Sequence, residues 1–440
     1  FYKMKKTLLF AFALSLGIAN VATAQGDYSL TRDWKTNTTA KGADARQGCF
    51  ANGKFYIQNR PAGQIEIWDQ NGMVGTLPST DKSTGICADD AGNILVTNVT
   101  EFEFGTESGT TRPVRIYPNG AAPATDIDLY LVCPPPASLS SDMRCDYFGH
   151  IEGNIMSEEG GEACWIVNRR KYLNILPIKN GAQDDDNSQA VLMDQNCFVN
   201  PVESFQTSGS AISSLTQSVA FKFNDEYCFD SRYIGLKGVE ISTNDEGNLA
   251  AANKNDYTTA QSVWSYDPAY SCHVVGNTLF EMGGEKFIVA MIQYKTVDKE
   301  RESSFAIVRA SDQEKVAIWA SKDHEAGIVA ATAGANWITV VPVSENEAAI
   351  YQYFPAENAG EGWIAKYTFK NNGSSVEGVA EAKAKVIAGQ GTIRIDGEAE
   401  NIEVYNVAGT LISKGQTEVE CAAGLYIVKV DGTVSKVLVK

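Results

Sequence analysis

Polar side chains at the ends of predicted strands are the groups in this chain whose chemistry suggests ligand binding. An asparagine ends one strand in each of four related segments, and a basic residue follows it in three of them. Amides and guanidinium groups bind polar or anionic ligands, and arginine can contact such ligands through two parallel hydrogen bonds. The alternative is that each asparagine caps its own turn through its side chain. The predicted ligand-binding residues are Asn59, Arg60, Asn98, Asn168, Arg169, Arg170, Asn253 and Lys254.

The signatures of common catalytic sites are missing from the sequence. It has no HExxH zinc motif, no GxSxG nucleophile turn and no glycine-rich phosphate loop. Its three histidines, His150, His273 and His324, each stand alone, which is more often structural than catalytic. The acidic run at residues 184–187 lacks the spacing and the closing glutamate of a calcium loop. The sequence therefore favours a non-catalytic protein with no metal and no cofactor, and leaves open a calcium ion held by scattered oxygen ligands.

Aromatic side chains offer a second binding chemistry, because flat rings stack on sugars. The candidates are Trp68, Tyr117, Trp264 and Trp319. Trp68 and Tyr117, however, occupy matching positions in matching segments, which favours packing between neighbouring repeats over contact with a ligand.

A repeated pattern of short strands must position these residues. The segments that begin at Gly48, Gly85 and His150 share a glycine turn, an alternating strand that ends in asparagine, a second alternating strand and a closing Asn-Gly pair. Asn-Gly is a strong hairpin signal because both residues tolerate positive φ. A fourth copy begins at Val239 and ends its strand at Asn253. Periods of about 40 to 60 residues with three or four strands each are typical of propeller blades.

The repeats mark seven candidate blades along the chain. The fourth is poorly patterned, so six blades remain an alternative, and two stacked β-sandwiches remain a competing fold. The strand at residues 28–34 stands apart from the repeats, and adding it to the last blade would close the ring and remove exposed edges. The predicted fold is all-β: a six- or seven-bladed β-propeller followed by a small C-terminal antiparallel β-sandwich. The candidate blades begin near Gly48, Gly85, Arg144, Asp194, Gly238, Glu281 and Ala330.

The propeller prediction gives the polar residues a common face. In a propeller the loop after the second strand of each blade lies on one face of the disc, near the central channel. The strand-final asparagines and the basic residues after them would ring that face, and inserted loops at residues 99–112 and 294–303 would enlarge it. The Gly-Asn strand followed by a hydrophobic-x-hydrophobic-aromatic strand resembles NHL-type and SMP-30-like propellers, and this resemblance implies the fold only.

The first residues have the pattern of a cleavable secretion signal. Lys5 and Lys6 precede an apolar run at residues 8–18, and Ala22-Thr23-Ala24 provides the small residues that a signal peptidase needs. No later stretch approaches the roughly 18 apolar residues of a membrane span. We therefore expect residues 1–24 to be a signal peptide, and the mature chain to be secreted or displayed on the outer-membrane surface without inserting into a membrane.

The last residues form a second, separate pattern. Residues 371–385 are small, polar and charged, as in a linker, and residues 386–440 alternate in short strands between glycine turns. Three motifs occur in order: a V-Y-N-x-x-G turn at residues 404–409, an A-G-L-Y-x strand from residue 423, and a terminal K-V-x-V-K strand from residue 436. This end resembles the C-terminal sorting domain of type IX secretion cargo in Bacteroidota, which implies export. A β-sandwich that merely packs on its neighbour is the alternative.

Composition excludes some partners. The chain carries 54 acidic and 37 basic residues, a formal net charge of −17, which repels nucleic acid backbones and anionic lipid. Its nine cysteines include no CxxC motif. Cys49 and Cys87 precede equivalent strands, which favours small buried side chains, with disulfides as the alternative. We expect a monomer with no nucleic acid partner.

Together these patterns predict an exported β-propeller at residues 25–370 that binds a glycan, protein or peptide ligand without catalysis. Two other functions stay open. A secreted hydrolase or lyase would have scattered carboxylates, and calcium in some cases, at the channel mouth. A purely structural envelope component would fit the same sequence.

Overall fold

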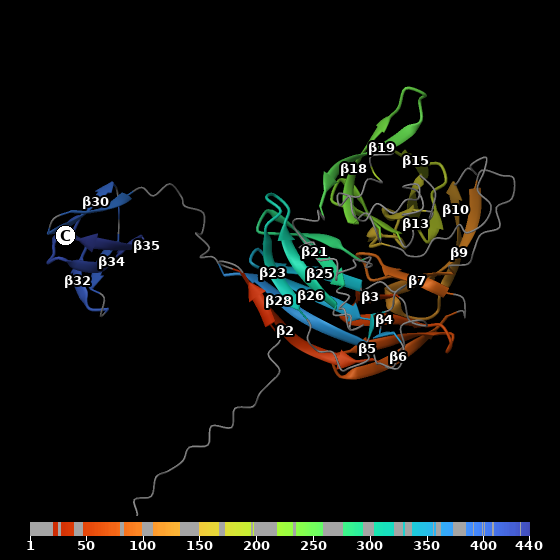
Figure 1. Ribbon diagram of the computed structural model, residues 1–440, viewed down its shortest axis with the longest axis horizontal. Helices are drawn as coiled ribbons and strands as arrows, with labels where there is room; N and C mark the ends of the chain where they lie inside the picture. Colours follow the sequence, from red (N-terminus) through yellow and green to blue (C-terminus); the bar gives the residue numbers. More distant parts are fainter. Residues whose placement is uncertain are drawn as a thin grey trace, which may run out of the picture. The chain divides into compact units, whose positions relative to one another are not determined.

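A computed structural model describes most of the two predicted β-rich regions. Contacts divide the chain into two parts, Phe1–Gly373 and Ser374–Lys440. Apart from 3-10 residues at Pro118–Gly120 and Cys197, all described regular structure is β-strand (Figure 1). The described residues are 21–24, 28–38, 47–79, 83–98, 109–132, 149–166, 172–194, 197, 218–231, 235–257, 276–293, 303–320, 329–330, 337–354, 356–357, 362–372, 384–389, 391–397, 399, 401–406, 409–431 and 433–440.

The first three blades are four-stranded antiparallel units that follow one another along the chain. Blade 1 contains β3 (Gly48–Ala51), β4 (Lys54–Asn59), β5 (Gln64–Asp69) and β6 (Gly72–Pro78). Blade 2 contains β7 (Ser83–Ala88), β8 (Ile94–Asn98), β9 (Gly109–Tyr117) and β10 (Thr125–Val132). Blade 3 contains β11 (Glu152–Asn154), β12 (Gly160–Ile166), β13 (Tyr172–Lys179) and β15 (Gln189–Met193), and the short β14 (Ala182–Gln183) also pairs with β13.

Three further blades follow among the described residues. Blade 4 contains β16 (Ser218–Phe223), β17 (Glu226–Ser231), β18 (Gly235–Thr243) and β19 (Leu249–Asp256). Blade 5 contains β20 (Thr278–Met282), β21 (Glu285–Gln293), β22 (Ser303–Arg309) and β23 (Lys315–Ala320), and β1 (Val21–Ala24) pairs outside β23. Blade 6 contains β25 (Trp337–Ser344), β26 (Glu347–Phe354), β28 (Trp363–Asn371) and, outermost, β2 (Tyr28–Asn37). A separate two-stranded pair joins β24 (Val329–Ala330) to β27 (Ala356–Glu357).

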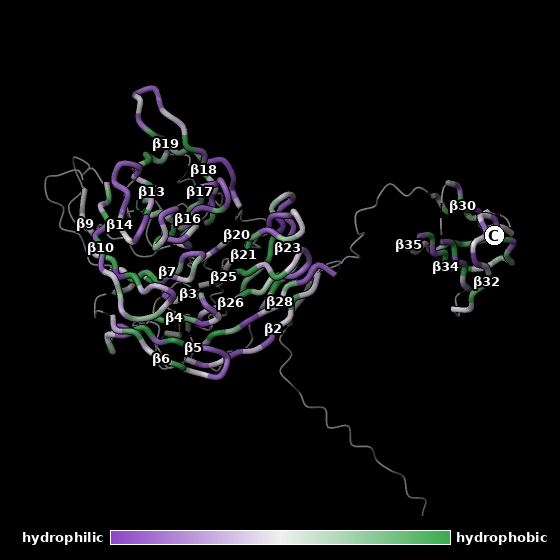
Figure 2. Tube along the Cα trace, turned by 180° about the vertical axis from the view of Figure 1, so that it is seen from behind, coloured by the Kyte–Doolittle hydropathy of each residue, from purple (hydrophilic) through white to green (hydrophobic). Residues whose placement is uncertain are grey.

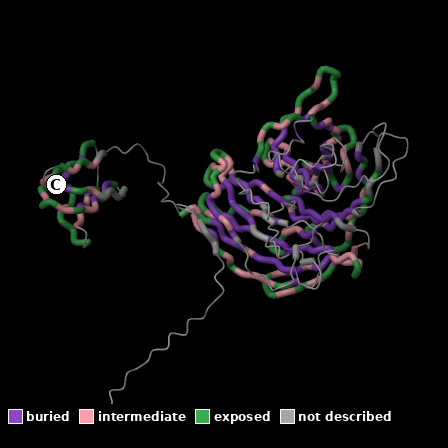
Figure 3. The backbone as a smooth tube through the Cα atoms, in the orientation of Figure 1, coloured by how far each residue is buried: buried purple, intermediate pink, exposed green. Residues whose placement is uncertain are grey.

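Apolar side chains fill every interface between consecutive blades. Because successive side chains of a strand point to opposite faces, each blade contributes to two such cores. Examples are Tyr56 with Ile86 between blades 1 and 2, and Phe55 with Tyr353 between blades 1 and 6. Clusters of the same kind lie between blades 2 and 3, 3 and 4, 4 and 5, and 5 and 6. The ring therefore closes through blades 6 and 1, and the strands carry most of the buried, hydrophobic residues (Figures 2 and 3).

The all-β propeller prediction is confirmed, with corrections to the blade boundaries. Six blades lie among the described residues. The candidate blades at Asp194 and Gly238 were wrong as separate units, because Gly238 lies inside β18, the third strand of blade 4. The candidate start at Arg144 lies outside the described residues. The isolated strand at residues 28–34 joins the last blade as expected, since β2 pairs with β28 from Tyr28 to Asn37.

Blades 3 and 4 are joined at their outer edges. β15 and β19 pair in parallel through Leu192 with Ala250 and Met193 with Ala251. At the inner edge β16 lies against β12. The eight strands of the two blades therefore form a nearly closed, barrel-like sheet.

The outer edge of blade 2 is covered by a side chain. The amide of Gln183 lies against β10: its Oε1 accepts a hydrogen bond from the Tyr130 N–H at 2.7 Å, and its Nε2 donates to the Tyr130 carbonyl at 3.2 Å. A neighbouring strand would use the same two backbone groups.

The C-terminal part is a small antiparallel β-sandwich. One sheet contains β29 (Ala384–Ala388), β30 (Thr392–Gly397) and β33 (Glu418–Glu420). The other contains β31 (Ile402–Asn406), β32 (Leu411–Lys414), β34 (Gly424–Val430) and β35 (Thr433–Val439). Ile393, Val404 and Val428 are fully buried between them. The expected Asn406 turn is present, because the Asn406 side chain accepts a hydrogen bond from the Thr410 N–H at 2.9 Å and Gly409 has φ +78°.

Candidate functional site

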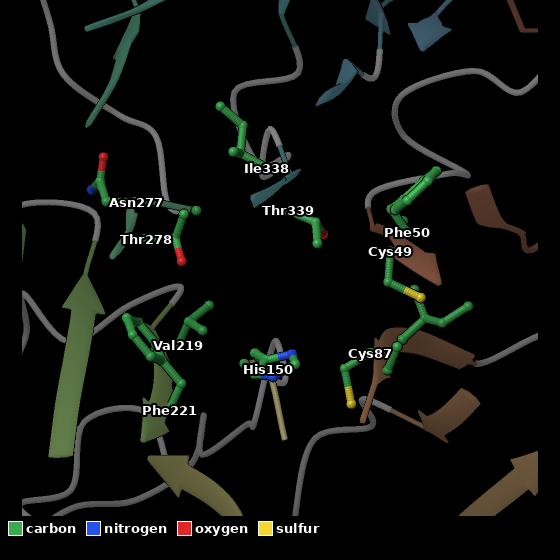
Figure 4. A pocket seen from close by; sticks show the side chains of 15 residues that line it. Cys49, Phe50, Cys87, His150, Val219, Phe221, Asn277, Thr278, Ile338 and Thr339 are labelled. Carbon is green, nitrogen blue, oxygen red and sulfur yellow. The ribbon is translucent and has the colours of Figure 1, made fainter. Parts of the chain in front are cut away.

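The innermost strands of the six blades surround a central channel. β3, β7, β11, β16, β20 and β25 are each the terminal strand of a sheet, so one edge of each faces the channel. A bridge between Asp89 and Ile151 links β7 to the start of blade 3. No described strand pairs with the free edges of β3, β16, β20 or β25. Figure 4 shows side chains from all six blades around the inner pocket, with Cys49 and Phe50 on the side opposite Val219 and Phe221.

The channel widens at one face into a cavity of about 690 Å³. Its rim includes the turns between first and second strands, among them Asn52-Gly53, Asp90–Gly92 and Asn224. We call this the turn face. The connections between second and third strands, and those between blades, lie at the other end of the strands. The sequence pattern predicted the binding site at the loops after the second strands, which lie at that other end. The cavity therefore lies at the opposite end of the channel from the predicted site.

The wall formed by blades 2 and 3 carries a hydrogen-bonded pair of side chains, Asp90 and His150. His150 Nε2 lies 2.7 Å from Asp90 Oδ1, and the Gly153 N–H donates to Asp90 Oδ2 at 2.8 Å. Burial favours the neutral acid, but these hydrogen bonds and the charge of the histidine outweigh it and lower the pKa of Asp90. Gly149, next to His150, lets the start of blade 3 lie close to β16, because a Cβ at that position would lie 2.2 Å from the Ala220 carbonyl oxygen.

The wall between blades 3 and 4 carries two glutamates that share one lysine. Glu152 and Glu162 are cross-strand partners, and Lys222 Nζ lies 3.6 Å from a carboxylate oxygen of each. Tyr227 donates a hydrogen bond to Glu162 at 2.9 Å. Burial and then the charge of Glu162 raise the pKa of the Tyr227 phenol, so it stays a donor. Oε2 of Glu152 is buried and has no hydrogen-bond partner among the described residues.

The wall formed by blades 6 and 1 is apolar. It contains Ile338, Val340 and Val341 of β25 and Phe50 of β3. Val341 is 40% exposed, whereas Phe50 stacks on Tyr351 with ring centroids 3.5 Å apart. The cavity therefore places a charged wall opposite an apolar one, an arrangement that suits a ligand with both kinds of group.

Two of the predicted site residues lie in a capped turn, as the alternative interpretation expected for asparagine. Asn59 ends β4, where its Nδ2 donates to Glu66 Oε1 at 2.7 Å and its Oδ1 accepts from the Ala62 N–H at 3.3 Å. Arg60 lies in the same turn, half-buried. Asn98 ends β8, and its side chain is not described. Asn168, Arg169 and Arg170 lie outside the described residues.

The sequence pattern placed Asn253 and Lys254 at the end of a second strand, and this placement was wrong. They lie in β19, the outermost strand of blade 4, rather than at the end of a second strand. Asn253 Nδ2 donates to Asp256 Oδ1 at 3.3 Å, and the same oxygen contacts the buried Lys237. Asn59 and Asn253 therefore occupy different places in their blades and do not belong to one ring.

The other sequence candidates are mostly core residues. Trp68, Tyr117 and Trp319 are buried between blades, which agrees with the packing interpretation, and Trp264 lies outside the described residues. Cys49 and Cys87 are free thiols, and burial raises the pKa of both, which suppresses the reactive thiolate. Within the described segments, no group of three acidic, histidine or cysteine side chains could hold a metal ion, and no helix is long and apolar enough to cross a membrane.

Comparison with known proteins gives similarities of structure at low identity. No family model and no curated protein sequence matches the chain. A DUF4623 family protein from Bacteroides eggerthii is similar over 79% of this chain and 78% of its own, with 8% identity and a TM-score of 0.49. Streptogramin B lyase is similar over 78% and 97%, with 11% identity and a TM-score of 0.36. PorZ, a surface component of the type IX secretion system of Porphyromonas gingivalis, is similar over 90% and 75%, with 10% identity and a TM-score of 0.13. A shared fold does not by itself carry a function, so the residues of this chain decide what it can do.

The Asp90–His150 pair predicts a specific pH dependence of stability. Because the folded state lowers the pKa of Asp90, the ionised carboxylate stabilises the fold at pH values above its ordinary pKa of about 4. The stabilisation is lost as the pH falls through the lower folded pKa. We expect Asp90→Asn to melt below the wild type at pH 7 and the gap to close in acid. Melting temperatures of the two proteins, measured from pH 7 down into acid, test this expectation. A difference that stays constant with pH would contradict the stabilising role of the Asp90 carboxylate.

Proposed function

We propose that the protein is an exported propeller that binds an extended segment of a peptide or protein at the turn-face mouth of its channel, without catalysis. One observation carries the proposal. All six blades contribute to a cavity whose walls present, side by side, free strand edges, charged groups and apolar side chains. Free strand edges offer backbone donors and acceptors in the spacing that an extended peptide matches.

The aromatic lining favours a peptide over a glycan. Sugar binding uses exposed aromatic faces, but the rings that line this cavity already pack on other side chains. Phe50 stacks on Tyr351, Phe280 stacks on Phe287, and Lys286 lies over the ring of Phe223. Among the described lining residues none is a tryptophan or a tyrosine.

The carboxylates favour binding over hydrolysis. Asp89 is buried and accepts hydrogen bonds from Asn93 and from the Ile155 N–H, which is a structural role. Asp90 is paired with His150, and Glu152 lies beside Lys222. The Asp90–His150 pair is the observation that supports the second candidate, a secreted hydrolase or lyase, because a carboxylate that orients a histidine is part of many general-base sites.

Export is the second half of the proposal. Its support is the signal pattern at residues 1–24 and the three ordered motifs at the end of the chain. The C-terminal sandwich that carries these motifs belongs to its own part of the chain, Ser374–Lys440, as a detachable sorting domain would. Amino-terminal sequencing of secreted protein from the native host should begin at Gln25.

Filling the channel tests the binding proposal. Thr339 lines both the inner pocket and the wider cavity, so Thr339→Trp should place an indole across the mouth. We expect a phage-displayed library of random linear peptides to yield binders on the wild type, and their signal to fall by at least about tenfold on the variant. Thr76→Trp, on the exposed outer strand β6, is the matched control. No enrichment on the wild type, or equal binding to Thr339→Trp, would contradict the proposal.

A further inference from the structure

The described lining of the turn-face cavity has more negative than positive charge. Four carboxylates line it, those of Asp89, Asp90, Glu152 and Glu281, against a single ammonium, that of Lys222. Asp89 is satisfied internally by Asn93 and Ile155. The other three acids belong to blades 2, 3 and 5, so they surround the cavity from different sides.

The only lysine among the described lining residues cannot neutralise the cavity. Lys222 faces two carboxylates, Glu152 and Glu162, at equal distances of 3.6 Å. Burial lowers the pKa of Lys222, but the two glutamates outweigh it and raise the pKa. Lys222 is therefore protonated, and its charge already interacts with two carboxylates.

The carboxylates keep free capacity to accept hydrogen bonds. Asp90 receives one bond on each oxygen and is 53% exposed on its side chain, whereas each carboxylate oxygen can accept two. Oε2 of Glu152 accepts no hydrogen bond from the described residues. Glu281 is exposed on β20. Carboxylate oxygens with spare acceptor capacity beside a cavity are satisfied most strongly by an incoming donor that is also a cation.

The apolar wall suits the rest of such a group. Val340, Val341 and Pro342 lie on the blade 6 side of the same cavity. Lysine and arginine bury their methylene stems on apolar surface while their charged ends reach polar groups. A free metal ion would not use this wall, and no described triad of ligands could hold one.

We infer that the segment bound at the turn face carries a lysine or an arginine, whose side chain enters the cavity with its stem on β25 and its charged end between Asp90, Glu152 and Glu281. This inference rests on the proposed function and specifies its ligand. The backbone of the segment lies along the free edges of the inner strands. An acidic segment is excluded, because its carboxylates would face those of the cavity.

The test uses the peptides that the random library yields on the full-length protein. Most should share one basic residue beside apolar ones. For one such peptide, labelled with fluorescein, replacing the basic residue by norleucine should weaken binding to the wild type by about tenfold, since a charge-assisted hydrogen bond is lost. On the double variant Glu152→Gln, Glu281→Gln the two peptides should bind alike. Glu246→Gln, on the exposed turn between β18 and β19, should behave like the wild type.

The possible failures can be told apart. If no peptide binds, the proposed function fails. If peptides bind and depend on Thr339 but share no basic residue, or if the norleucine peptide binds equally well, the function stands and this inference is overturned. The glutamine substitutions keep the size of the side chain, and circular dichroism checks that the double variant is folded.

Discussion

Replacing Asp230 with alanine is expected to destabilise the propeller by about 3–5 kcal/mol, because the change removes a buried carboxylate that holds two blades together. Asp230 lies fully buried at the end of β17 and accepts hydrogen bonds from the Gly276 N–H at 2.8 Å, the Asn277 N–H at 3.1 Å and the Asn277 side-chain amide at 2.7 Å. These groups immediately precede β20, so one carboxylate fixes where blade 5 begins. Without it, two buried backbone donors lose their acceptor.

Urea unfolding followed by tryptophan fluorescence measures the decrease in the free energy of unfolding. The decrease should be smaller for Asp230→Asn, because one amide oxygen remains to accept a hydrogen bond. The matched control is Asp185→Ala, at an exposed turn position, which should change the free energy of unfolding by no more than about 0.5 kcal/mol. An Asp230→Ala variant as stable as this control would show that the junction does not depend on the carboxylate.

Removing β2 is the second change with a large expected effect. A chain that begins at Thr38 lacks the outer strand of blade 6, including the buried Leu30 and the ring of Tyr28 that stacks on Phe369 at 5.3 Å. We expect its melting temperature to fall by at least about 10 °C, because the loss amounts to several kcal/mol of packing and pairing. A synthetic peptide of residues 28–37 should restore part of the difference by binding the folded state.

The control keeps β2 and loses β1. A chain that begins at Gln25 still has four strands in blade 5, because β1 is a fifth strand outside β23. It should melt within about 2 °C of the full chain. If the chain that begins at Thr38 had the same melting temperature as the chain that begins at Gln25, β2 would not be the strand that closes the ring.

Local sequence patterns predicted the strands and their hairpins but not the position of each hairpin within a blade. The turn at Asp89–Asn93 and the turn at Asn244–Asn248 use the same chemistry. In each, the first side chain accepts a hydrogen bond from the N–H four residues later, and the glycine has φ near +80°. The first turn joins strands one and two of blade 2, whereas the second joins strands three and four of blade 4. Identical turn chemistry could not distinguish them, and this led to the misplacement of Asn253.

The cavity could not be predicted for a different reason. Its walls combine short segments from all six blades, and Asp90, His150 and Lys222 come from three blades that are far apart in the sequence. A single histidine or lysine carries no local signal of such a site. What the sequence did contain was the position of His150 and Asp90 at the ends of inner strands, which becomes informative only once the ring is known to close.

The Gln183 amide that covers β10 has a consequence for behaviour at high concentration. An uncovered outer strand accepts a strand from a second molecule, and such additions start ordered aggregates. At Tyr130 both backbone groups are already engaged by a side chain of the same molecule. A strand arriving there would first have to displace that amide, so a second molecule meets a barrier to pairing at this edge.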